Sequence, residues 1–275
     1  MFLQDRFDAA DEYGSSTGAP LIVIVVGTHC SGGSAVAALL QRHGVAMGFD
    51  DLPLSTGVAG DRDASFENPR FRILNDRIAE RQGYVIASWK PEIPVFRPGA
   101  ITRLRMRRLI RSFDERHSVW GFKDPRCCIT LDAWLREIER IDRLGETRII
   151  YTVRDPDAAV RAMTWRTGID SATALRLWKS YNERALSTID AWQPATHYVS
   201  YEDLEDHADR ATTALLRFIG LFPNDGPGAA LAFAEPSGSV ISSESEALAK
   251  AVTEMKSRMS RRVRESLRSA ARETE

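Results

Sequence analysis

The sequence predicts an α/β fold in which a central, mainly parallel sheet is flanked by helices in three layers. Short apolar, β-branched runs alternate with longer segments of helical periodicity, an order typical of parallel sheets wrapped by helices. The first apolar run, at residues 21–26, is unbroken, as expected for a strand covered on both faces. A chain of 275 residues is long enough to bury such a sheet.

The expected elements follow in order from residue 21. A glycine-rich turn comes directly after the first strand, and a helix is expected at residues 35–42, where Val36, Leu39 and Leu40 recur at helical spacing. Further strands are predicted at 119–122, 148–153 and 197–200, and further helices at about 69–81, 101–116, 130–143, 157–167, 171–191 and 208–219.

The domain organisation is expected to be simple. Residues 1–20 are polar, end in a stretch rich in Gly, Ser and Thr, and show no hydrophobic period, so we expect a flexible leader. No internal repeat or break in composition divides residues 21–275, which are expected to form one domain. From about residue 243 the pattern is that of a charged amphipathic helix. We expect it to dock on the protein's own core, with peripheral membrane contact as the alternative.

The charge balance argues against nucleic acid as a partner. Lys and Arg total 37 against 38 Asp and Glu, so the net charge is −1 and no global field attracts a polyanion. One dense run of arginines, at residues 103–111, is expected to be a solvated helix face. An anionic partner for this run is the alternative.

Cysteine usage and apolar runs favour the cytoplasm. Cys30, Cys127 and Cys128 match neither a disulfide framework nor a metal-ligand spacing. The strongly apolar run at residues 21–26 is far shorter than the roughly 20 residues that cross a bilayer, and the acidic segment before it is unlike a signal peptide. We therefore expect a cytoplasmic protein with no transmembrane segment and no bound metal.

The turn after the first strand, GTHCSGGS at residues 27–34, is the first candidate binding site. Backbone N–H groups of such a turn and the dipole of the following helix favour a bound phosphate. The turn nearly satisfies GxxxxGK[ST], but Gly33 takes the place of the lysine, and no strand ends in an unambiguous magnesium-binding carboxylate. A nucleoside triphosphatase is therefore disfavoured, and a plain tight turn is the alternative. The candidate binding residues are Thr28, His29, Cys30, Ser31, Gly32, Gly33 and Ser34.

Several segments, in order, resemble those of the PAPS-dependent sulfotransferases of the bacterial kind. The first loop is similar to the family's GxHRSGTS, and KDPR at residues 123–126 and RDP at residues 154–156 follow later strands as they do in the family. Weaker similarities lie at residues 66–76, 177–182 and 201–221. The resemblance covers roughly residues 21–222 and implies a P-loop-type fold.

The resemblance also implies an activity. PAPS would donate a sulfuryl group to a hydroxyl or amine of a carbohydrate, lipid or small-molecule acceptor, leaving PAP, with no metal required. The first loop would bind the 5′-phosphosulfate of the donor, and Arg154 would bind its 3′-phosphate. Lys123 would stabilise the transferring group. The base that takes the acceptor's proton would be Glu67, which matches a glutamate near the acceptor side of related enzymes, or His29.

Three positions depart from the family's pattern. Its basic loop residue falls on Cys30, the following threonine on Gly33, and a serine eight residues after the RDP arginine on Ala162. Each change removes a donor to a phosphate or sulfonate, and Lys123 is the candidate to replace the lost cation. A catalytically impaired nucleotide-binding protein is therefore one alternative function, and a small-molecule kinase is another.

Two groups of charged residues have open roles. The family's glycine-rich basic loop near the C-terminus has no match here, and an arginine among residues 258–262 is the candidate to contact the 3′-phosphate in its place. Lys123 and Arg126 have a second interpretation, as an exposed ion-pair group with Asp124.

Overall fold

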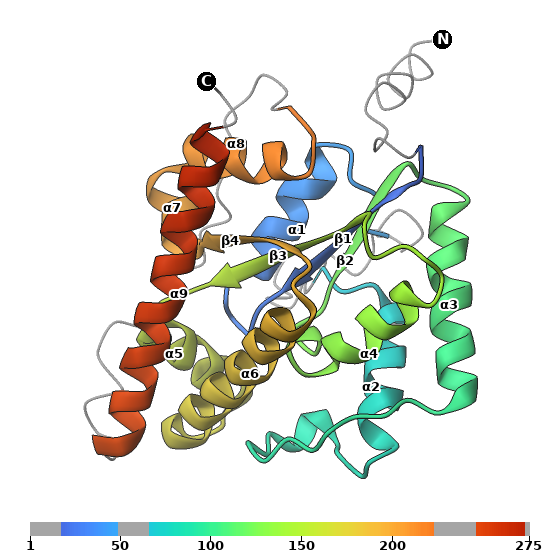
Figure 1. Ribbon diagram of the computed structural model, residues 1–275. Helices are drawn as coiled ribbons and strands as arrows, with labels where there is room; N and C mark the ends of the chain where they lie inside the picture. The colour runs from blue at the N-terminus through green and yellow to red at the C-terminus, as the bar shows by residue number, and fades with distance from the viewer. Residues whose placement is uncertain (1–17, 49–65, 223–245, 273–275) are drawn as a thin grey trace, which may run out of the picture.

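The computed structural model describes residues 18–48, 66–222 and 246–272, and it contains a four-stranded sheet (Figure 1). The strands are β1 (Leu21–Val26), β2 (Val119–Lys123), β3 (Thr147–Val153) and β4 (Ala195–Ser200). They lie in the order β2-β1-β3-β4, and each neighbouring pair is parallel. The predicted α/β class is therefore confirmed. Most of the expected leader, residues 1–17, and the expected start of the terminal helix at 243 lie outside the described residues.

β1 lies inside the sheet and is buried along its whole length. Its even-numbered residues, such as Ile24, join one hydrophobic cluster, and its odd-numbered residues, such as Val23, join the other. A strand covered on both faces needs an apolar side chain at every position, which explains the unbroken run of residues 21–26.

Helices cover both faces of the sheet (Figure 1). α1 (Gly33–Arg42) and α8 (Ala208–Phe218) pack on the odd-numbered side chains of β1. The opposite cluster takes side chains from α2 (Pro69–Glu80), α3 (Ala100–Asp114), α4 (Cys127–Glu139), α5 (Pro156–Thr167), α6 (Ser171–Trp192) and α9 (Glu246–Arg272). A sheet with a helical layer on each side is the expected three-layer sandwich.

α4 begins and ends earlier than the sequence pattern indicates. It starts at Cys127 rather than near 130, because the N–H of Cys127 already donates to the carbonyl of Asp124 at 2.9 Å. It ends at Glu139, four residues early, and the chain leaves it through a turn in which Asp142 has a left-handed conformation with φ of 56°. The KDPR segment therefore leads directly from β2 into a helix.

Two short helices were not expected. η3 (Ile86–Ser88) is a single 3₁₀ turn between α2 and α3. The segment between β4 and the helix predicted from residue 208 forms α7 (Tyr201–Asp206), and the hydroxyl of Ser200 accepts the N–H of Asp203 at 3.4 Å as its N-terminal cap. Periodicity cannot predict so short a helix, because six residues make less than two turns.

α9 packs along the β4 side of the sheet (Figure 1). Its side chains Val252, Met259 and Val263 are buried in the larger hydrophobic cluster. The hydroxyl of Ser266 accepts the backbone N–H of Tyr198 in β4 at 3.0 Å. The expectation that the amphipathic terminal helix docks on the protein's own core is confirmed.

Candidate functional site

The loop from residue 27 to 34 is held tightly against β3. The Ser31 hydroxyl forms a hydrogen bond of 2.6 Å with the Thr152 hydroxyl, and a Cβ atom at Gly27 would lie 1.9 Å from that same Thr152 oxygen. At Gly32, where φ is +92°, a Cβ atom would lie 2.4 Å from the Tyr201 ring. Both glycines are therefore required by close approach, and the loop is a rigid turn that leads into α1.

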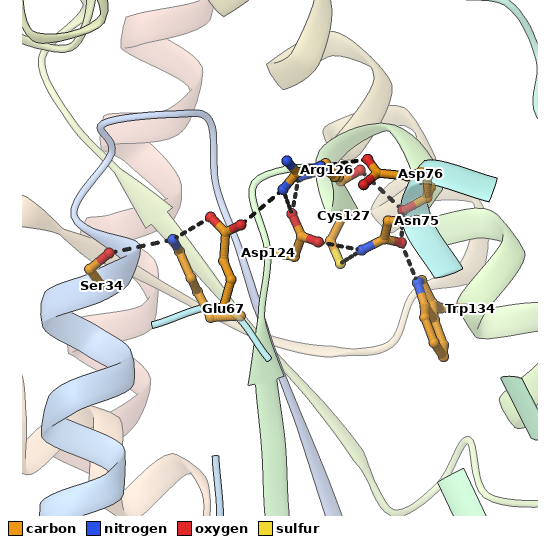
Figure 2. A network of polar contacts seen from close by, with 10 residues as sticks. Ser34, Glu67, Asn75, Asp76, Asp124, Arg126, Cys127 and Trp134 are labelled. Carbon is orange, nitrogen blue, oxygen red and sulfur yellow. Dashed lines mark hydrogen bonds and ion pairs between the residues drawn. The ribbon is translucent and has the colours of Figure 1, made fainter. Parts of the chain in front are cut away.

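Lys123, the last residue of β2, lies over the start of α1. Its ammonium nitrogen is 3.3 Å from Glu67 Oε1 and 3.4 Å from Ser34 Oγ (Figure 2). Its Cε atom is 3.1 Å from the place that a Cβ atom at Gly33 would occupy. The absence of a side chain at position 33 thus leaves room for a cation supplied by a different strand.

Glu67 bridges two cations. Its second oxygen accepts from the guanidinium of Arg126 at 2.9 Å, and Arg126 also binds Asp124 and Asp76, each at 3.0 Å (Figure 2). The interpretation of these residues as an exposed group around Asp124 is wrong, because Lys123 and Asp124 are buried and Lys123 pairs with Glu67. The charges form one continuous network at the carboxyl end of β2.

Packing and charge set the protonation states in this network. Burial alone would raise the pKa of Glu67, but Lys123 and Arg126 more than offset it and lower that pKa below its usual value. Burial likewise opposes the charged form of Arg126, but the carboxylates of Asp124 and Glu67 raise its pKa. Glu67 is therefore an ionised carboxylate, and Arg126 remains charged.

Asn75 holds Asp124, one carboxylate of the network, in place. Its amide nitrogen donates to Asp124 at 2.7 Å, and its oxygen accepts from Thr130 at 2.7 Å and from Trp134 at 2.8 Å (Figure 2). Asn75 and Asp124 are both buried, so these bonds fix the carboxylate that orients Arg126. The sequence similarity at residues 66–76 includes Asn75, but only the packing shows what it does.

His29 lies on an aromatic side of the loop. Its ring is edge-on to Trp89 at 5.1 Å between centroids and 5.7 Å from the ring of Tyr181. Its Nε2 atom is buried and has no hydrogen-bond partner within the described ranges. Burial, together with the charges of Arg126 and Lys123, lowers the pKa of His29 to about 3, so the imidazole is neutral near pH 7.

Arg154, the residue after β3, turns toward the loop from the opposite side. Its guanidinium donates to the carbonyl of Cys30 at 2.9 Å and lies 4.3 Å above the Tyr201 ring. Cys30 itself has a left-handed conformation and packs its side chain against the larger hydrophobic cluster. The residue at the family's basic loop position is thus an apolar contact.

α9 supplies a cation that the sequence interpretation missed. Lys256 binds the carboxylate of Asp155 at 2.6 Å, and Asp155 also caps α5 by accepting the N–H of Asp157 at 3.0 Å. Arg258 and Arg262, within the range expected to contact a 3′-phosphate, instead bind Asp190 on α6. Only the packing of α9 shows that Lys256 is the residue that reaches the RDP segment.

The structure brings the predicted residues together at one edge of the sheet. The loop of residues 27–34 follows β1, and Arg154 follows β3 and binds that loop. Lys123 ends β2 and binds Glu67. Ala162 lies on α5 and is buried. Ligands bind at this edge in parallel α/β sheets.

Comparison with known proteins identifies the family of this chain. A model of the sulfotransferase family matches residues 20–225. The chain belongs to the sulfotransferase family. The match contains the loop, the KDPR and RDP segments and all four strands, and it ends before α9. The sulfotransferase family and its P-loop-type fold, predicted from the first loop together with the KDPR and RDP segments, are therefore confirmed.

Other comparisons add little to this assignment. No curated protein matches this sulfotransferase. One similar solved structure is that of an uncharacterized protein from Eubacterium ventriosum, at 15% identity and a TM-score of 0.38, over 72% of this chain and 97% of that chain. In the part of the chain that the structure describes, no helix is long and apolar enough to cross a membrane. The same residues contain no group of three or more His, Cys, Asp or Glu side chains placed to hold a metal ion.

Proposed function

We propose that this sulfotransferase binds PAPS at the carboxyl edge of the sheet and passes its sulfuryl group to a hydroxyl or amine acceptor. The observation that carries the proposal is the placement of two cations. Lys123 lies at the Ser34 end of the loop, and Arg154 lies at its Cys30 end. A donor with two separate anionic groups fits two separate cations better than a single phosphate would.

The 5′ end of the donor fits the start of α1. N–H groups of residues 32–34 and the helix dipole would hold the phosphosulfate, and the ammonium of Lys123 would neutralise its charge. The N–H of Ser31 donates to the Thr28 carbonyl at 3.2 Å and so closes the turn. The absence of a side chain at Gly33 leaves room for Lys123, which supplies the cation that is missing at position 30. The Cys30 side chain packs against the larger hydrophobic cluster. Two of the three departures from the family's pattern are therefore compensated, which favours an active enzyme over an impaired nucleotide-binding protein.

The 3′ end of the donor fits Arg154. The guanidinium is planar and offers several donors, which suits a phosphate, and the Tyr201 ring holds it in place. The Lys256 ammonium lies nearby on Asp155 and adds positive charge to this end of the site.

PAPS would supply the sulfuryl group, whose bond to the 5′-phosphate breaks as the acceptor oxygen or nitrogen bonds to sulfur. Lys123 stabilises the charge that develops on the leaving phosphate, which keeps the electron pair. Glu67 takes the acceptor's proton, because it is ionised and contacts Lys123. His29, whose imidazole is also unprotonated near pH 7, is the alternative base, but its ring packs against Trp89 and Tyr181 and its Nε2 atom is buried.

Thermal unfolding with PAP tests the donor site. PAP at 100 times its dissociation constant should raise the unfolding free energy of the wild-type protein by about 2.7 kcal/mol. Arg154→Met and Lys123→Met should each weaken PAP binding by about tenfold or more, because each removes a charge-assisted bond. Arg136→Ala and Lys179→Ala are the matched controls, since each removes an exposed ion pair on α4 or α6. No shift of the wild-type melting temperature at millimolar PAP would overturn the proposal.

Turnover tests the reaction itself. Radiolabelled PAPS incubated with a mixture of carbohydrate, lipid and small-molecule acceptors should label at least one of them without added metal. Lys123→Met should abolish labelling. PAP binding without labelling of any acceptor would favour the impaired nucleotide-binding alternative, and activity that requires Mg²⁺ and ATP would favour a kinase.

A further inference from the structure

Positive charge is concentrated in one part of the chain. Residues 69–116, which form α2, η3 and α3, hold twelve Lys and Arg against five Asp and Glu. Their net charge is +7 in a chain whose net charge is −1. The charge is therefore segregated, and the local field differs from that of the whole molecule.

α3 presents two opposite faces. Met106, Leu109, Ile110 and Phe113 are buried, and the helix packs on α2 and α4 at the outer side of the molecule (Figure 1). Five exposed residues point the other way; they recur every three or four positions and share a side of the helix about 120° wide, on which Ser112 is half-buried and Glu115 follows the last turn. We call Ile101, Leu104, Arg105, Arg108 and Arg111 the outer face of α3.

The arginines of the outer face of α3 differ from Arg107 on the same helix and from Arg258 and Arg262 on α9. Arg107, at the side of the same helix, binds Glu137 on α4, and Arg258 and Arg262 of α9 bind Asp190. Within residues 18–48, 66–222 and 246–272, no ion pair involves the three arginines of the outer face. Their charges are not used to hold the fold together.

Two large apolar side chains are exposed on this face, and others are exposed in the same segment of the chain. Ile101 is 69% exposed and Leu104 is 41% exposed, although both lie between arginines. Seven large hydrophobic residues are exposed in the described part of the chain, and five of them lie between residues 73 and 104: Ile73, Val85, Val95, Ile101 and Leu104. Apolar exposure and positive charge therefore coincide.

We propose that the outer face of α3 docks the protein on an anionic lipid surface. The arginines would contact the headgroups, and the aliphatic side chains of Ile101 and Leu104 would enter the boundary of the acyl region. A nucleic acid would use the arginines for its phosphates but would gain nothing from exposed aliphatic side chains. The combination of apolar and basic side chains on this face therefore fits a lipid surface best.

Vesicle flotation at low and high salt tests the proposal. Wild-type protein should float with vesicles of phosphatidylcholine and phosphatidylserine and stay in solution with phosphatidylcholine alone or at high salt. Arg105→Gln/Arg108→Gln/Arg111→Gln should weaken binding by about a hundredfold, since each basic residue contributes about one kcal/mol at such a surface. Ile101→Ser/Leu104→Ser keeps every charge and should still weaken binding by about tenfold.

A second triple variant controls for net charge. Arg264→Gln/Arg268→Gln/Arg272→Gln removes the same charge from exposed positions of α9 and should leave binding near the wild-type value. All variants should keep the wild-type melting temperature and its response to PAP, because none touches the candidate site. Equal loss of binding in the α9 variant, or equal binding to neutral vesicles, would overturn the proposal. So would loss on removing the arginines but not the aliphatic pair, which would indicate a generic polyanion surface.

Discussion

Gly27 sets the distance between the binding loop and β3. In Gly27→Ala the new Cβ atom would meet the Thr152 hydroxyl at 1.9 Å, so the loop must move and the Ser31–Thr152 hydrogen bond must open. We expect a loss of about 1–3 kcal/mol in unfolding free energy and at least tenfold weaker PAP binding. Urea unfolding and calorimetric titration with PAP measure the two effects.

The controls for this substitution lie within the chain. A Cβ atom at Gly145 meets nothing within 4 Å, so Gly145→Ala should be close to neutral. Gly27→Ala/Thr152→Ala removes the nearer of two clashing hydroxyls, the other being Ser31 Oγ at 2.4 Å, and should be more stable than the sum of its single variants predicts. Strict additivity would contradict this account of the loop.

We expect Glu67 to act as the general base that takes the acceptor's proton. Glu67→Gln should lower kcat by about 10²–10⁴, the usual contribution of a general base, while PAP binding stays equal or tightens because a negative charge is removed. Asp76→Asn is the matched control, because Asp76 binds the same Arg126 but does not contact Lys123. A kcat close to that of the wild type in Glu67→Gln would exclude the residue as the base.

At the scale of elements, α9 is a structural part of this sulfotransferase although it follows the family match. Met259→Ala should lower the unfolding free energy by about 2–4 kcal/mol, since the side chain is buried in the main cluster. Ser266→Ala should cost about 1 kcal/mol, because it leaves the Tyr198 N–H without its acceptor. Denaturant unfolding measures both, with the exposed Ser269→Ala as control. Wild-type stability in Met259→Ala would show that α9 is not part of the cooperative fold.

Element identity was predictable, whereas element ends were less so. The buried strands appear as short unbroken apolar runs and the long helices show helical periodicity, because burial on both faces and burial on one side leave different patterns. The start of α4 was missed because a carbonyl of the KDPR segment accepts its first N–H. Such hydrogen bonds depend on local geometry and leave no periodic trace in the sequence.

At the scale of the whole molecule, stability should fall in mild acid. His197 is buried and its Nε2 atom has no hydrogen-bond partner among the residues described, and burial lowers its pKa to about 4. Below pH 6.5 the imidazole of His197 binds a proton in the unfolded chain but stays neutral in the folded chain. The unfolding free energy therefore decreases as pH falls from 6.5 to 4, by roughly 3 kcal/mol. His29, with its pKa of about 3, acts in the same direction.

The pH dependence has a direct measurement. Urea unfolding of the wild type between pH 7.5 and 5 should give a falling free energy, and His197→Leu should give a shallower slope. The leucine keeps the site apolar next to Phe218, on which the His197 ring is stacked. An identical slope in the two proteins would mean that His197 binds its proton equally well in the folded and unfolded states.

The placement of the candidate site residues at one edge of the sheet follows from the sequence alone. Parallel strands place their carboxyl ends at one edge, so the segments that follow residues 26, 123 and 153 must lie at that edge once a parallel sheet is predicted. The strand order β2-β1-β3, which only the structure shows, makes these segments neighbours. The glycine loop, Lys123 and Arg154 are such segments or belong to them. Strand order and strand direction together therefore bring these residues to one site.

The partner of each charge was decided only by tertiary structure. Lys123 pairs with Glu67 rather than with its neighbour Asp124, and Lys256 rather than Arg258 reaches the RDP segment. These pairs join residues that are far apart in the chain, and which side chains meet depends on how whole helices pack. Periodicity determines which face of a helix is buried, but the contacts of a charged side chain depend on the rotation and position of the elements around it.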